Sequence, residues 1–473
     1  MILALSILVI IHELGHFTFA RLCGVRVEKF YMFFNPWFSL VSIKKFDGRW
    51  HVRFLHRTEE KDPWDEHPES TEWGIGWVPF GGYCAIAGMV DETHDAETIE
   101  KTPAQPWEFR SKNVFQRFLI IIGGILVNFV AAMLIYVLVI FNTGTTTLPL
   151  KNVTSGLYFS ELLQDEGFQQ HDRILSVDGR EPQELHDFIQ WTIIEGRRDV
   201  MLLRGQDTVS LTLSADLGKR YLGLQNEYDR IQRQKAREDK NYQKRSYVLV
   251  GEYIPFVIKS VLSQGAADYA GLMVGDSIVS IAGVPTPSFY EVQAQLQRHP
   301  CDSIEIGFFR EGNYQTRDAF IGDQCMLGVG VMTKYEIFDL EHQDYNIIEA
   351  IPAGIKNGWD FLVMYIRQFK LVFTKEGAQS VGGFGAIGNM FPETWSWVGF
   401  WQITGMISMI LAFMNFLPIP ALDGGYILFL LVEMLTGKKP SDKFLEKANN
   451  IGFWLLLALM IFANFNDVFK IFF

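Results

Sequence analysis

The sequence contains only four cysteines in 473 residues, too few for a scaffold held together by disulfides. It also lacks an excess of basic residues, because its net charge is −12, which argues against nucleic acid as a partner. No cleavable signal peptide is evident, so we expect the first apolar segment to be retained. Apolar residues are plentiful instead, at 48% of the chain. With a mean hydropathy of +0.10, this composition predicts membrane helices combined with soluble domains.

The first 22 residues carry the feature around which the chain is organised. Residues 1–22 are almost entirely apolar, and a helix needs about 20 residues to cross a bilayer. Within them, His12, Glu13 and His16 form an H-E-x-x-H pattern. Positions four apart lie on one face of a helix, so both imidazoles can bind one metal ion, with Glu13 beside them as a general base. Ionisable groups are costly inside a membrane, which makes all three functional candidates.

Three further segments are apolar enough to cross a membrane. The second span covers residues 113–141. The third, together with the motif after it, covers residues 395–435, and the fourth covers residues 451–473. Basic residues gather in segment 23–112 and in the short loop between the last two spans. The positive-inside rule places both of these in the cytoplasm. Both termini and the long segment between the second and third spans are then expected to face outward.

The segment 23–112 is expected to contain membrane re-entrant β-structure. Residues 38–43 and 50–55 flank Asp47-Gly48, a strong hairpin signal. Residues 73–88 are apolar, rich in glycine and too short to span a membrane. We expect them to form a β-hairpin that dips towards the metal, where irregular backbone must be covered by protein or water. A soluble hairpin packed beneath the spans is the alternative.

A candidate third ligand follows the third span, where residues 415–425 read N-F-L-P-I-P-A-L-D-G-G. The prolines interrupt the helix and turn the chain, so that Asp423 can reach the metal. Two histidines, one carboxylate and an open position for water make a catalytic zinc arrangement. For Asp423 alone, an N-cap of the next helix is the alternative.

Two similar units are expected in the outward segment, over residues 145–225 and 248–334. The second reads A-A-D-Y-A-G-L-M-V-G-D-S-I-V-S-I-A-G over residues 266–283, which resembles the bacterial PDZ pattern A-x-x-A-G-L-x-x-G-D-x-I-x-x-I-x-G. In the first unit, His171 replaces the glycine before the aspartate, so its turn is expected to differ. PDZ domains bind extended peptide at a sheet edge, and spacers that bind nothing are the alternative.

The remaining segments give weaker signals. Residues 226–247 are dense in mixed charge and are expected to form a linker or loop. Residues 345–390 are expected to form an amphipathic helix on the outer membrane face and then an extended approach to the third span. We also hypothesise a disulfide between Cys301 and Cys325, because a hairpin folded about Gly312-Asn313 would bring them almost opposite. A pair of free thiols is the alternative.

H-E-x-x-H in the first span and N-x-x-P-x-P-x-L-D-G at the third together resemble the signatures of the site-2 protease family of intramembrane zinc metalloproteases. Four spans with two outward PDZ units are similar to its RseP type. The resemblance implies a polytopic α-helical membrane protein with four transmembrane helices, a membrane-associated β-hairpin region and two α+β PDZ domains. It implies the bacterial inner membrane, with the PDZ domains and both termini in the periplasm.

The resemblance also implies an activity, namely hydrolysis of peptide bonds within transmembrane segments of pre-cleaved single-span proteins. Anti-sigma factors, and remnant signal peptides, are the substrates implied. Zn2+ would be bound by His12, His16 and Asp423, with Glu13 as the catalytic base. Candidate substrate contacts are Asn415, which matches the family's asparagine, together with Gly74, Gly76 and Pro418.

Two other classes of function are weighed against this one. A non-catalytic PDZ membrane scaffold would be favoured by degenerate zinc ligands, but all of them are present here. A metal transporter would be favoured by inverted repeats and broken helices in both halves of the chain, which the sequence does not show. In the protease that the resemblance implies, the PDZ pair is expected to exclude substrates with bulky outer domains.

Overall fold

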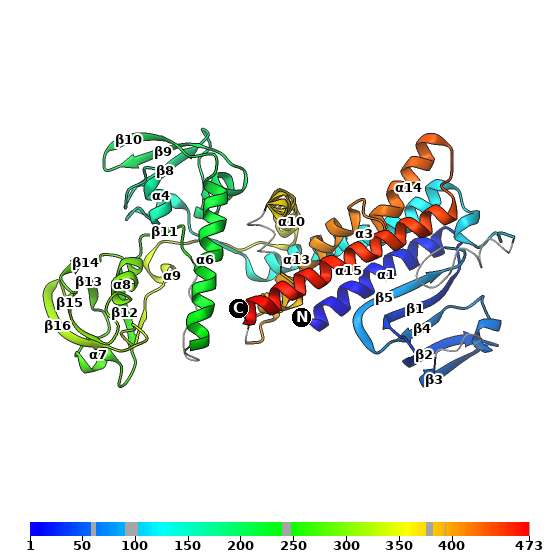
Figure 1. The fold of residues 1–473 in the computed structure, drawn as a ribbon, viewed down its shortest axis with the longest axis horizontal. Coiled ribbons are helices and arrows are strands. Elements are labelled where there is room, and N and C mark those ends of the chain that lie inside the picture. The colour runs from blue at the N-terminus through cyan, green and yellow to red at the C-terminus, as the bar shows by residue number, and fades with distance from the viewer. Residues whose placement is uncertain (58–62, 90–102, 239–246, 375–381, 393, 473) are drawn as a thin grey trace. The chain divides into compact units, whose positions relative to one another are not determined.

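The computed structural model describes residues 1–57, 63–89, 103–238, 247–374, 382–392 and 394–472. The chain divides into two compact units (Figure 1). The first unit comprises Met1–Gly144, Asp344–Ile366 and Val381–Phe472. The second comprises Thr145–Gln343 and Arg367–Ser380.

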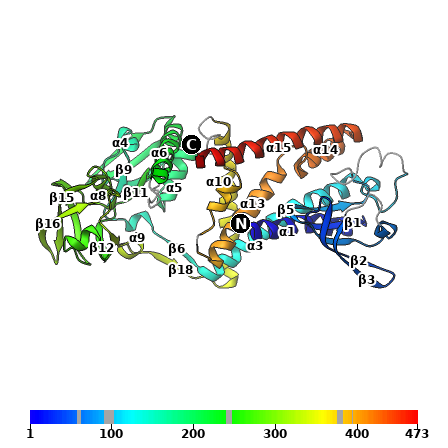
Figure 2. The same cartoon turned by 60° about the horizontal axis from the view of Figure 1, so that its bottom comes forward.

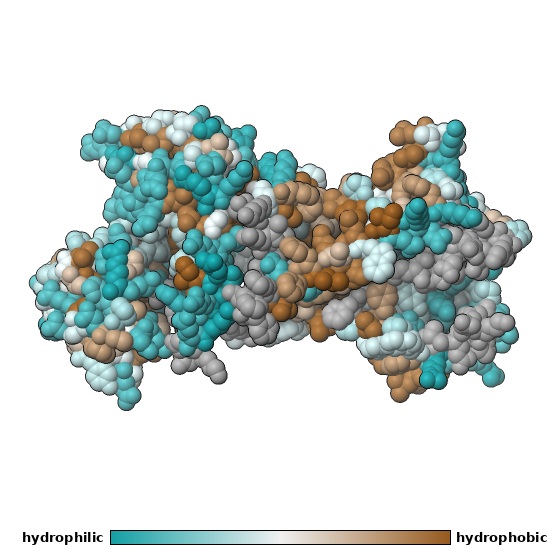
Figure 3. Space-filling view, viewed as in Figure 1, coloured by the Kyte–Doolittle hydropathy of each residue, from teal (hydrophilic) through white to brown (hydrophobic). Residues whose placement is uncertain are grey.

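Among the described residues, four helices are long and apolar enough to cross a membrane. They are α1 (Ile2–Leu22), α3 (Val114–Thr143), α13 (Trp397–Phe416) and α15 (Asp442–Phe472). These helices lie where the four spans were expected, and brown, apolar surface covers much of this unit in Figure 3. The third span ends before the motif that follows it, and α14 (Asp423–Thr436) is a separate helix.

Helix α3 organises the first unit, because α1, α13 and α14 all pack against it. Glycine allows the closest of these approaches: a Cβ on Gly15 of α1 would lie only 2.4 Å from the carbonyl oxygen of Gly123. Helix α14 is joined to α3 by a largely buried ion pair, in which Arg117 Nη2 lies 2.6 Å from Glu433 Oε1. The helices that carry the candidate ligands are therefore locked to one another.

Five strands between α1 and α3 form one sheet, in the order β3-β2-β4-β1-β5. The strands are β1 (Val27–Phe34), β2 (Phe38–Phe46), β3 (Arg49–Arg57), β4 (Glu72–Ile75) and β5 (Val78–Ile86). Strands β2 and β3 pair antiparallel around Asp47-Gly48, which confirms the predicted hairpin. Short 3-10 turns flank the later strands, η1 (Pro63–Glu66) and η2 (Phe109–Ser111).

The hairpin predicted over residues 73–88 is wrong, because β4 and β5 do not pair with each other. Strand β1 lies between them, parallel to β4 and antiparallel to β5. The connection from β4 to β5 crosses the end of β1, where the amides of Gly76 and Trp77 donate to the carbonyls of Met32 and Phe34 at 2.8 and 3.1 Å. The local hairpin signal therefore did not reveal that a strand whose residues lie 43 positions earlier in the chain pairs beside β4 and separates it from β5.

The sheet packs directly on the first span, with β5 beside α1 (Figure 2). A Cβ on Gly82 of β5 would lie 3.0 Å from Val9 Cγ1 of α1. Further along the helix, the ring of Phe17 contacts those of Phe30 and Trp73, with centroids 5.8 and 4.9 Å apart. Strand β5 is thus held along the helix that carries the H-E-x-x-H motif.

The amphipathic helix expected within residues 345–390 is present as α10 (Ile347–Phe369), followed by η5 (Lys370–Phe373). Its buried Ala350 packs on Val137 and Ile140 of α3. The extended approach to the third span is wrong for residues 384–389, which form helix α12 (Phe384–Asn389). Asp467 of α15 accepts the amides of Gly383 and Ala386 at 2.9 and 3.0 Å and so holds the first turn of α12. Residues 375–381 lie outside the described part of the chain.

The second unit contains two β-rich subunits, whose surfaces are mostly teal in Figure 3. The first subunit has a three-stranded sheet, β10-β9-β8, and the pair β11-β7 around a core that includes Phe159, Phe168 and Phe188. Its elements are β7 (Leu157–Phe159), α4 (Glu161–Asp165), β8 (Arg173–Val177), α5 (Leu185–Ile189), η4 (Gln190–Ile194), β9 (Asp199–Arg204), β10 (Asp207–Thr212) and β11 (Val250–Glu252).

The second subunit has strands in the order β16-β15-β13-β12-β17, with β14 beside β13. Its elements are β12 (Phe256–Val261), α7 (Ala266–Tyr269), β13 (Ser277–Ile281), β14 (Val284–Pro285), α8 (Phe289–Leu296), β15 (Asp302–Arg310), β16 (Asn313–Ile321), β17 (Val329–Val331) and α9 (Lys334–Ile337). The unit also contains η3 (Leu150–Asn152) and the antiparallel pair of β6 (Thr145–Thr147) and β18 (Glu341–Gln343).

An ion pair repeated in both subunits shows their internal similarity. In the first, Arg204 donates to both carboxylate oxygens of the buried Asp172 at 2.9 and 2.7 Å. In the second, Arg310 donates to both oxygens of the buried Asp276 at 2.7 Å each. Each arginine also donates to a backbone carbonyl five residues before its aspartate. Burial acts to raise the pKa of Asp276, but the bonds from Arg310 and from the Met273 amide outweigh it and lower that pKa.

The turn before Asp172 was expected to differ from its counterpart, and that expectation is wrong. His171 has φ +70°, in the same left-handed region as Gly275 at φ +93°. Histidine adopts this region at a cost of about 1–2 kcal/mol. Two contacts oppose the cost: His171 Nδ1 lies 2.9 Å from the carbonyl oxygen of Ser155, and its ring lies 3.9 Å from that of Tyr253.

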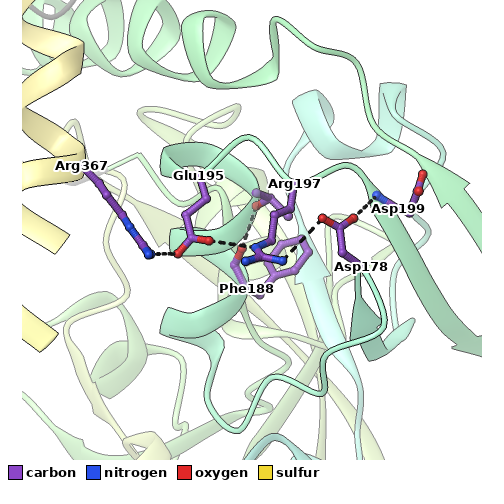
Figure 4. A network of polar contacts seen from close by, with 7 residues as sticks. Asp178, Phe188, Glu195, Arg197, Asp199 and Arg367 are labelled. Atoms are coloured by element: carbon purple, nitrogen blue, oxygen red, sulfur yellow. Dashed lines mark hydrogen bonds and ion pairs between the residues drawn. The ribbon is translucent and has the colours of Figure 1, made fainter. Parts of the chain in front are cut away.

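A polar network closes the first subunit beyond η4 (Figure 4). Arg197 donates to Glu195 at 2.8 Å and lies 3.6 Å from Asp178. Asp178 accepts the backbone amide of Asp199 at 3.1 Å. Glu195 also pairs with Arg367, from the stretch of α10 that belongs to this unit. The network ties the end of η4 to β9.

The charged linker expected over residues 226–247 is wrong where the structure describes it. Helix α6 (Leu217–Glu238) covers the first part, and residues 239–246 are not described. One face of α6 carries Leu217 and Tyr221, which pack on the core of the first subunit. Charged residues on its other faces can be solvated while the backbone is helical. The high density of charged residues predicted a linker, whereas the structure has an amphipathic helix there.

The hypothesised disulfide is also wrong, because Cys301 and Cys325 are free. Strands β15 and β16 pair from Arg310↔Asn313 to Asp302↔Ile321, so the hairpin turns about Glu311-Gly312. Both turn residues have positive φ, +49° and +79°, as a type I′ turn requires. The register is therefore three residues away from the one that would place the cysteines opposite each other.

Candidate metal centre

Three candidate ligands converge between α1 and the start of α14. His12 Nε2 and His16 Nε2 lie 3.2 and 3.4 Å from Asp423 Oδ2, and 3.3 Å from each other. The spacing of four along α1 places both rings on one face, and Asp423 begins α14 directly after the proline turn. Among the described residues, this is the one group of three or more His, Cys, Asp or Glu side chains arranged to hold a metal ion.

The residues fit zinc on two observations. Zinc–nitrogen and zinc–oxygen bonds of about 2.0–2.1 Å in a tetrahedron place ligand atoms about 3.3 Å apart. The three observed separations of 3.2–3.4 Å match this edge length. Asp423 Oδ2 is also buried and accepts no hydrogen bond from the residues described here. A buried carboxylate oxygen without a partner is costly unless a cation lies against it.

Contacts from α3 and α13 surround the two imidazoles. His16 Nδ1 lies 3.0 Å from the backbone carbonyl oxygen of Ile120, and His12 Nδ1 lies 3.3 Å from Asn128 Nδ2. Asn415 Nδ2 lies 3.4 Å from His12 Nε2. Asn128 did not enter the sequence-based interpretation, although a buried asparagine inside an apolar span is a signal that can be read from sequence.

The turn that presents Asp423 is compact because glycines allow backbone contact. A Cβ on Gly424 would lie 2.1 Å from the carbonyl oxygen of Leu417. Ala421 has φ +74°, so the turn stores strain at a non-glycine residue. Asn449 of α15 accepts the Ala421 amide at 3.3 Å and donates to the Tyr426 hydroxyl at 3.2 Å.

The other predicted site residues lie in different places. Glu13 follows His12 on α1 and is half-buried, and Asn415 is at the ligands. Gly74 lies within the sheet, where a Cβ would meet the Tyr31 ring at 2.2 Å. Gly76 lies against the backbone of Phe33 and Phe34. Pro418 is exposed in the turn between α13 and α14.

The two glycines therefore have a packing role that the sequence did not indicate. With no side chain at Gly74, the Tyr31 ring can lie across β4, and its hydroxyl donates to the buried Glu72. Burial, followed by the charge of Glu72, raises the pKa of Tyr31. Gly74 does not lie on a free edge of the sheet, because β4 is flanked by β1 and β2. Gly76 lies in the connection after β4, where its amide donates to the Met32 carbonyl.

Comparison with known proteins gives a consistent result. A family model described as peptidase family M50 matches residues 1–57 and 63–459. The chain is 27% identical to the Haemophilus influenzae protein named Regulator of sigma E protease, over 99% of this chain and 98% of that protein. It is 26% identical to Regulator of sigma-E protease RseP of Escherichia coli, over 98% of this chain and 97% of that protein. It is 25% identical to a Ralstonia nicotianae protein named "Putative zinc metalloprotease RSc1411", over 100% of this chain and 98% of that protein.

Proposed function

The chain belongs to peptidase family M50, the site-2 protease family, and from that premise we propose that it cuts peptide bonds within transmembrane segments of single-span membrane proteins. It is a zinc metalloendopeptidase. Because two relatives are named as regulators of sigma E, anti-sigma factors already shortened by another protease are the substrate class, with remnant signal peptides as a second. Its location is the bacterial inner membrane.

The position of the ligands within a span carries this proposal. His12 lies ten residues after the first residue of α1. At 1.5 Å per residue this is about 15 Å along the helix, which is half of a hydrocarbon core about 30 Å thick. His16 is buried and Asp423 reaches the same point. A metal at this depth acts on peptide bonds that are themselves in the membrane.

The side chains at the site divide the reaction between them. Zinc, when bound, lowers the pKa of water to about 7 and polarises a carbonyl group. The Glu13 carboxylate accepts a proton from the attacking water and passes it to the leaving amine nitrogen. The Asn415 amide, beside His12, donates a hydrogen bond to the substrate backbone at the scissile bond.

A transmembrane helix must be opened before attack, since its own hydrogen bonds cover the scissile bond. Strand β5 is suited to hold the opened segment, because in the described part of the sheet it pairs only with β1. Gly82 brings β5 to Val9, one turn before the ligands on α1. We assign edge pairing to β5 in place of Gly74 and Gly76.

The apolar face of β3 supports membrane association of this sheet. Trp50, Val52 and Phe54 alternate along the strand and are all exposed, at 63%, 49% and 74%. They lie on the sheet face that, through Trp73, packs on Phe17 of α1. The lipid interface beside α1 is the environment that this face fits.

The two subunits of the second unit act as outward PDZ domains over residues 145–225 and 248–334 that restrict substrates by size. A groove of about 810 Å³ in the second subunit supports peptide binding. It is lined by Val329 and Val331 of the edge strand β17 and by Gln293 and Leu296 of α8. An extended peptide can add to β17 in that groove. Basic residues in segment 23–112 support a cytoplasmic sheet, an outward second unit and outward termini.

One experiment tests this function. Purified protein in lipid is mixed with a single-span model substrate, with and without its outer domain, and the products are identified by mass spectrometry. We expect a cut within the span of the shortened substrate alone. Glu13→Gln should retain zinc and lose cleavage, whereas the control Glu66→Gln, at an exposed position in η1, should cleave normally. Normal cleavage by Glu13→Gln refutes the assigned base, and cuts outside the span refute intramembrane proteolysis.

A further inference from the structure

One face of α3 lies against both candidate histidine ligands. Ile120, Gly124 and Asn128 are spaced by four residues, so they form one stripe along the helix. Ile120 and Asn128 are buried, with exposures of 0% and 1%. The contact of Gly15 with Gly123 brings the backbones of α1 and α3 close enough for this stripe to reach the imidazoles.

Each position of the stripe makes a different contact. The carbonyl oxygen of Ile120 lies 3.0 Å from His16 Nδ1. Gly124 leaves room for both rings, because a Cβ there would lie 2.5 Å from His16 Nε2 and 2.8 Å from His12 Cε1. The Asn128 amide lies 3.3 Å from His12 Nδ1.

The contact at Ile120 fixes the tautomer of His16. A carbonyl oxygen only accepts hydrogen bonds, so His16 Nδ1 carries the proton and Nε2 is left free for a metal. His12 also directs Nε2 towards Asp423, so with a metal bound its Nδ1 carries the proton and needs an acceptor. The group opposite that proton is the amide of Asn128.

The amide of Asn128 can supply this acceptor. Its Oδ1 is buried and has no hydrogen-bond partner among the described residues. The oxygen and nitrogen of an amide are nearly equal in shape, so a half-turn about the Cβ–Cγ bond exchanges their places. Oδ1 then faces His12 Nδ1 at the observed 3.3 Å separation. The backbone around it is held independently, because Ser408 Oγ donates to the Asn128 carbonyl at 2.8 Å.

We propose that Asn128 is a positioning residue of the metal site. Its amide oxygen accepts the Nδ1 proton of His12 and holds that ring with Nε2 towards the metal. Together with the Ile120 carbonyl, it makes α3 the helix that orients both histidine ligands. The proposal rests on the metal site described above but not on the substrate or the position of the cut.

Zinc affinity tests the proposal, measured by competition with a chelating dye on the full-length protein in detergent. Asn128→Leu removes the acceptor and should weaken zinc binding about 10–100-fold. Asn128→Asp keeps an acceptor in the same shape and should bind zinc within about threefold of the native protein. Thr404→Val removes a buried hydrogen bond within α13 that does not involve Asn128, and it should leave the affinity unchanged. Native affinity in Asn128→Leu overturns the proposal.

Two further measurements separate positioning from simple loss of structure. Thermal unfolding of the metal-free variants should remain cooperative. If Asn128→Asp folds and loses as much affinity as Asn128→Leu, the amide acts as a donor and the proposal fails. In zinc-loaded native protein with ¹⁵N-labelled histidine, the Nδ1 proton of His12 should be protected from exchange, and Asn128→Leu should lose that protection. Retained protection also overturns the proposal. If the native protein itself does not bind zinc, the metal site fails and the proposed function with it.

Discussion

Replacing Gly124 by alanine provides a sharp test of the metal centre, because the added atom meets the ligands themselves. The new Cβ would lie 2.5 Å from His16 Nε2, whereas ordinary contacts begin at 3.4 Å. Something must therefore move by about 0.9 Å. Metal–ligand distances hold to within about 0.2 Å of their ordinary values, so a shift of this size is incompatible with an intact site.

The fold should tolerate this change better than the metal does. Alanine is favoured over glycine within a helix by about 1 kcal/mol, and overpacking costs about 1–3 kcal/mol. The net effect on the metal-free protein is then between no change and about 2 kcal/mol of destabilisation. Zinc affinity should fall more than 100-fold, beyond the usual effect of residues that only orient a ligand.

The assay compares zinc content by atomic emission, zinc affinity by chelator competition and thermal unfolding without metal. Gly223→Ala is the matched control, since Gly223 is in helix α6 and a Cβ there meets nothing within 4 Å. It should bind zinc normally and unfold at an equal or higher temperature. If Gly124→Ala binds one zinc with native affinity, α3 does not lie against the histidines in the way described.

Two further predictions concern the second unit. The pKa of Asp276 is lowered in the folded state, so its ionised form stabilises the fold above an unfolded pKa of about 4, and this stability is lost as the pH falls through the folded pKa. Asp276→Asn should therefore cost about 1.5–3 kcal/mol of stability at neutral pH and flatten the loss of stability in acid. Hydrogen exchange in β12 and β13 measures both effects, and an unchanged pH profile would contradict the ion pair with Arg310. Cys301 and Cys325 should both be alkylated in unreduced protein, because both are free, and a mass shift for a disulfide between them would contradict the register of β15 and β16.

The sequence was sufficient wherever the signal is local. The four spans follow from runs of apolar residues, and the β2-β3 hairpin follows from Asp47-Gly48 between two alternating strands. The group of His12, His16 and Asp423 was also predicted, because the motifs identify residues that can bind a metal even when the fold of the chain between them is unknown. Each of these features is marked by one or two short runs of residues.

Signals failed where a distant segment decides the structure. Residues 73–88 look like a hairpin, but β1 pairs with both of their strands and separates them. Residues 226–238 look like part of a charged linker, but they continue helix α6, whose Leu217 and Tyr221 pack on a core. Nothing within these two segments reports such partners. The expected disulfide failed for a local reason instead, because a turn at Glu311-Gly312, one residue earlier than expected, moved the pairing by two positions.

The L-D-G-G motif illustrates how chemistry and packing share the same residues. Its aspartate can be recognised as a ligand from sequence, but its glycines act through contacts that only the fold supplies. Gly424 and Gly425 lie against the backbone of Leu417 and Ile419, and Gly452 of α15 lies against Pro420, where its Cβ would be 1.9 Å from the carbonyl oxygen. A carboxylate can be aimed at a metal to within a few tenths of an ångström only if the turn beneath it cannot yield. The backbone contacts at these three glycines make the turn rigid, so Gly452 belongs to the metal centre although no ligand chemistry marks it.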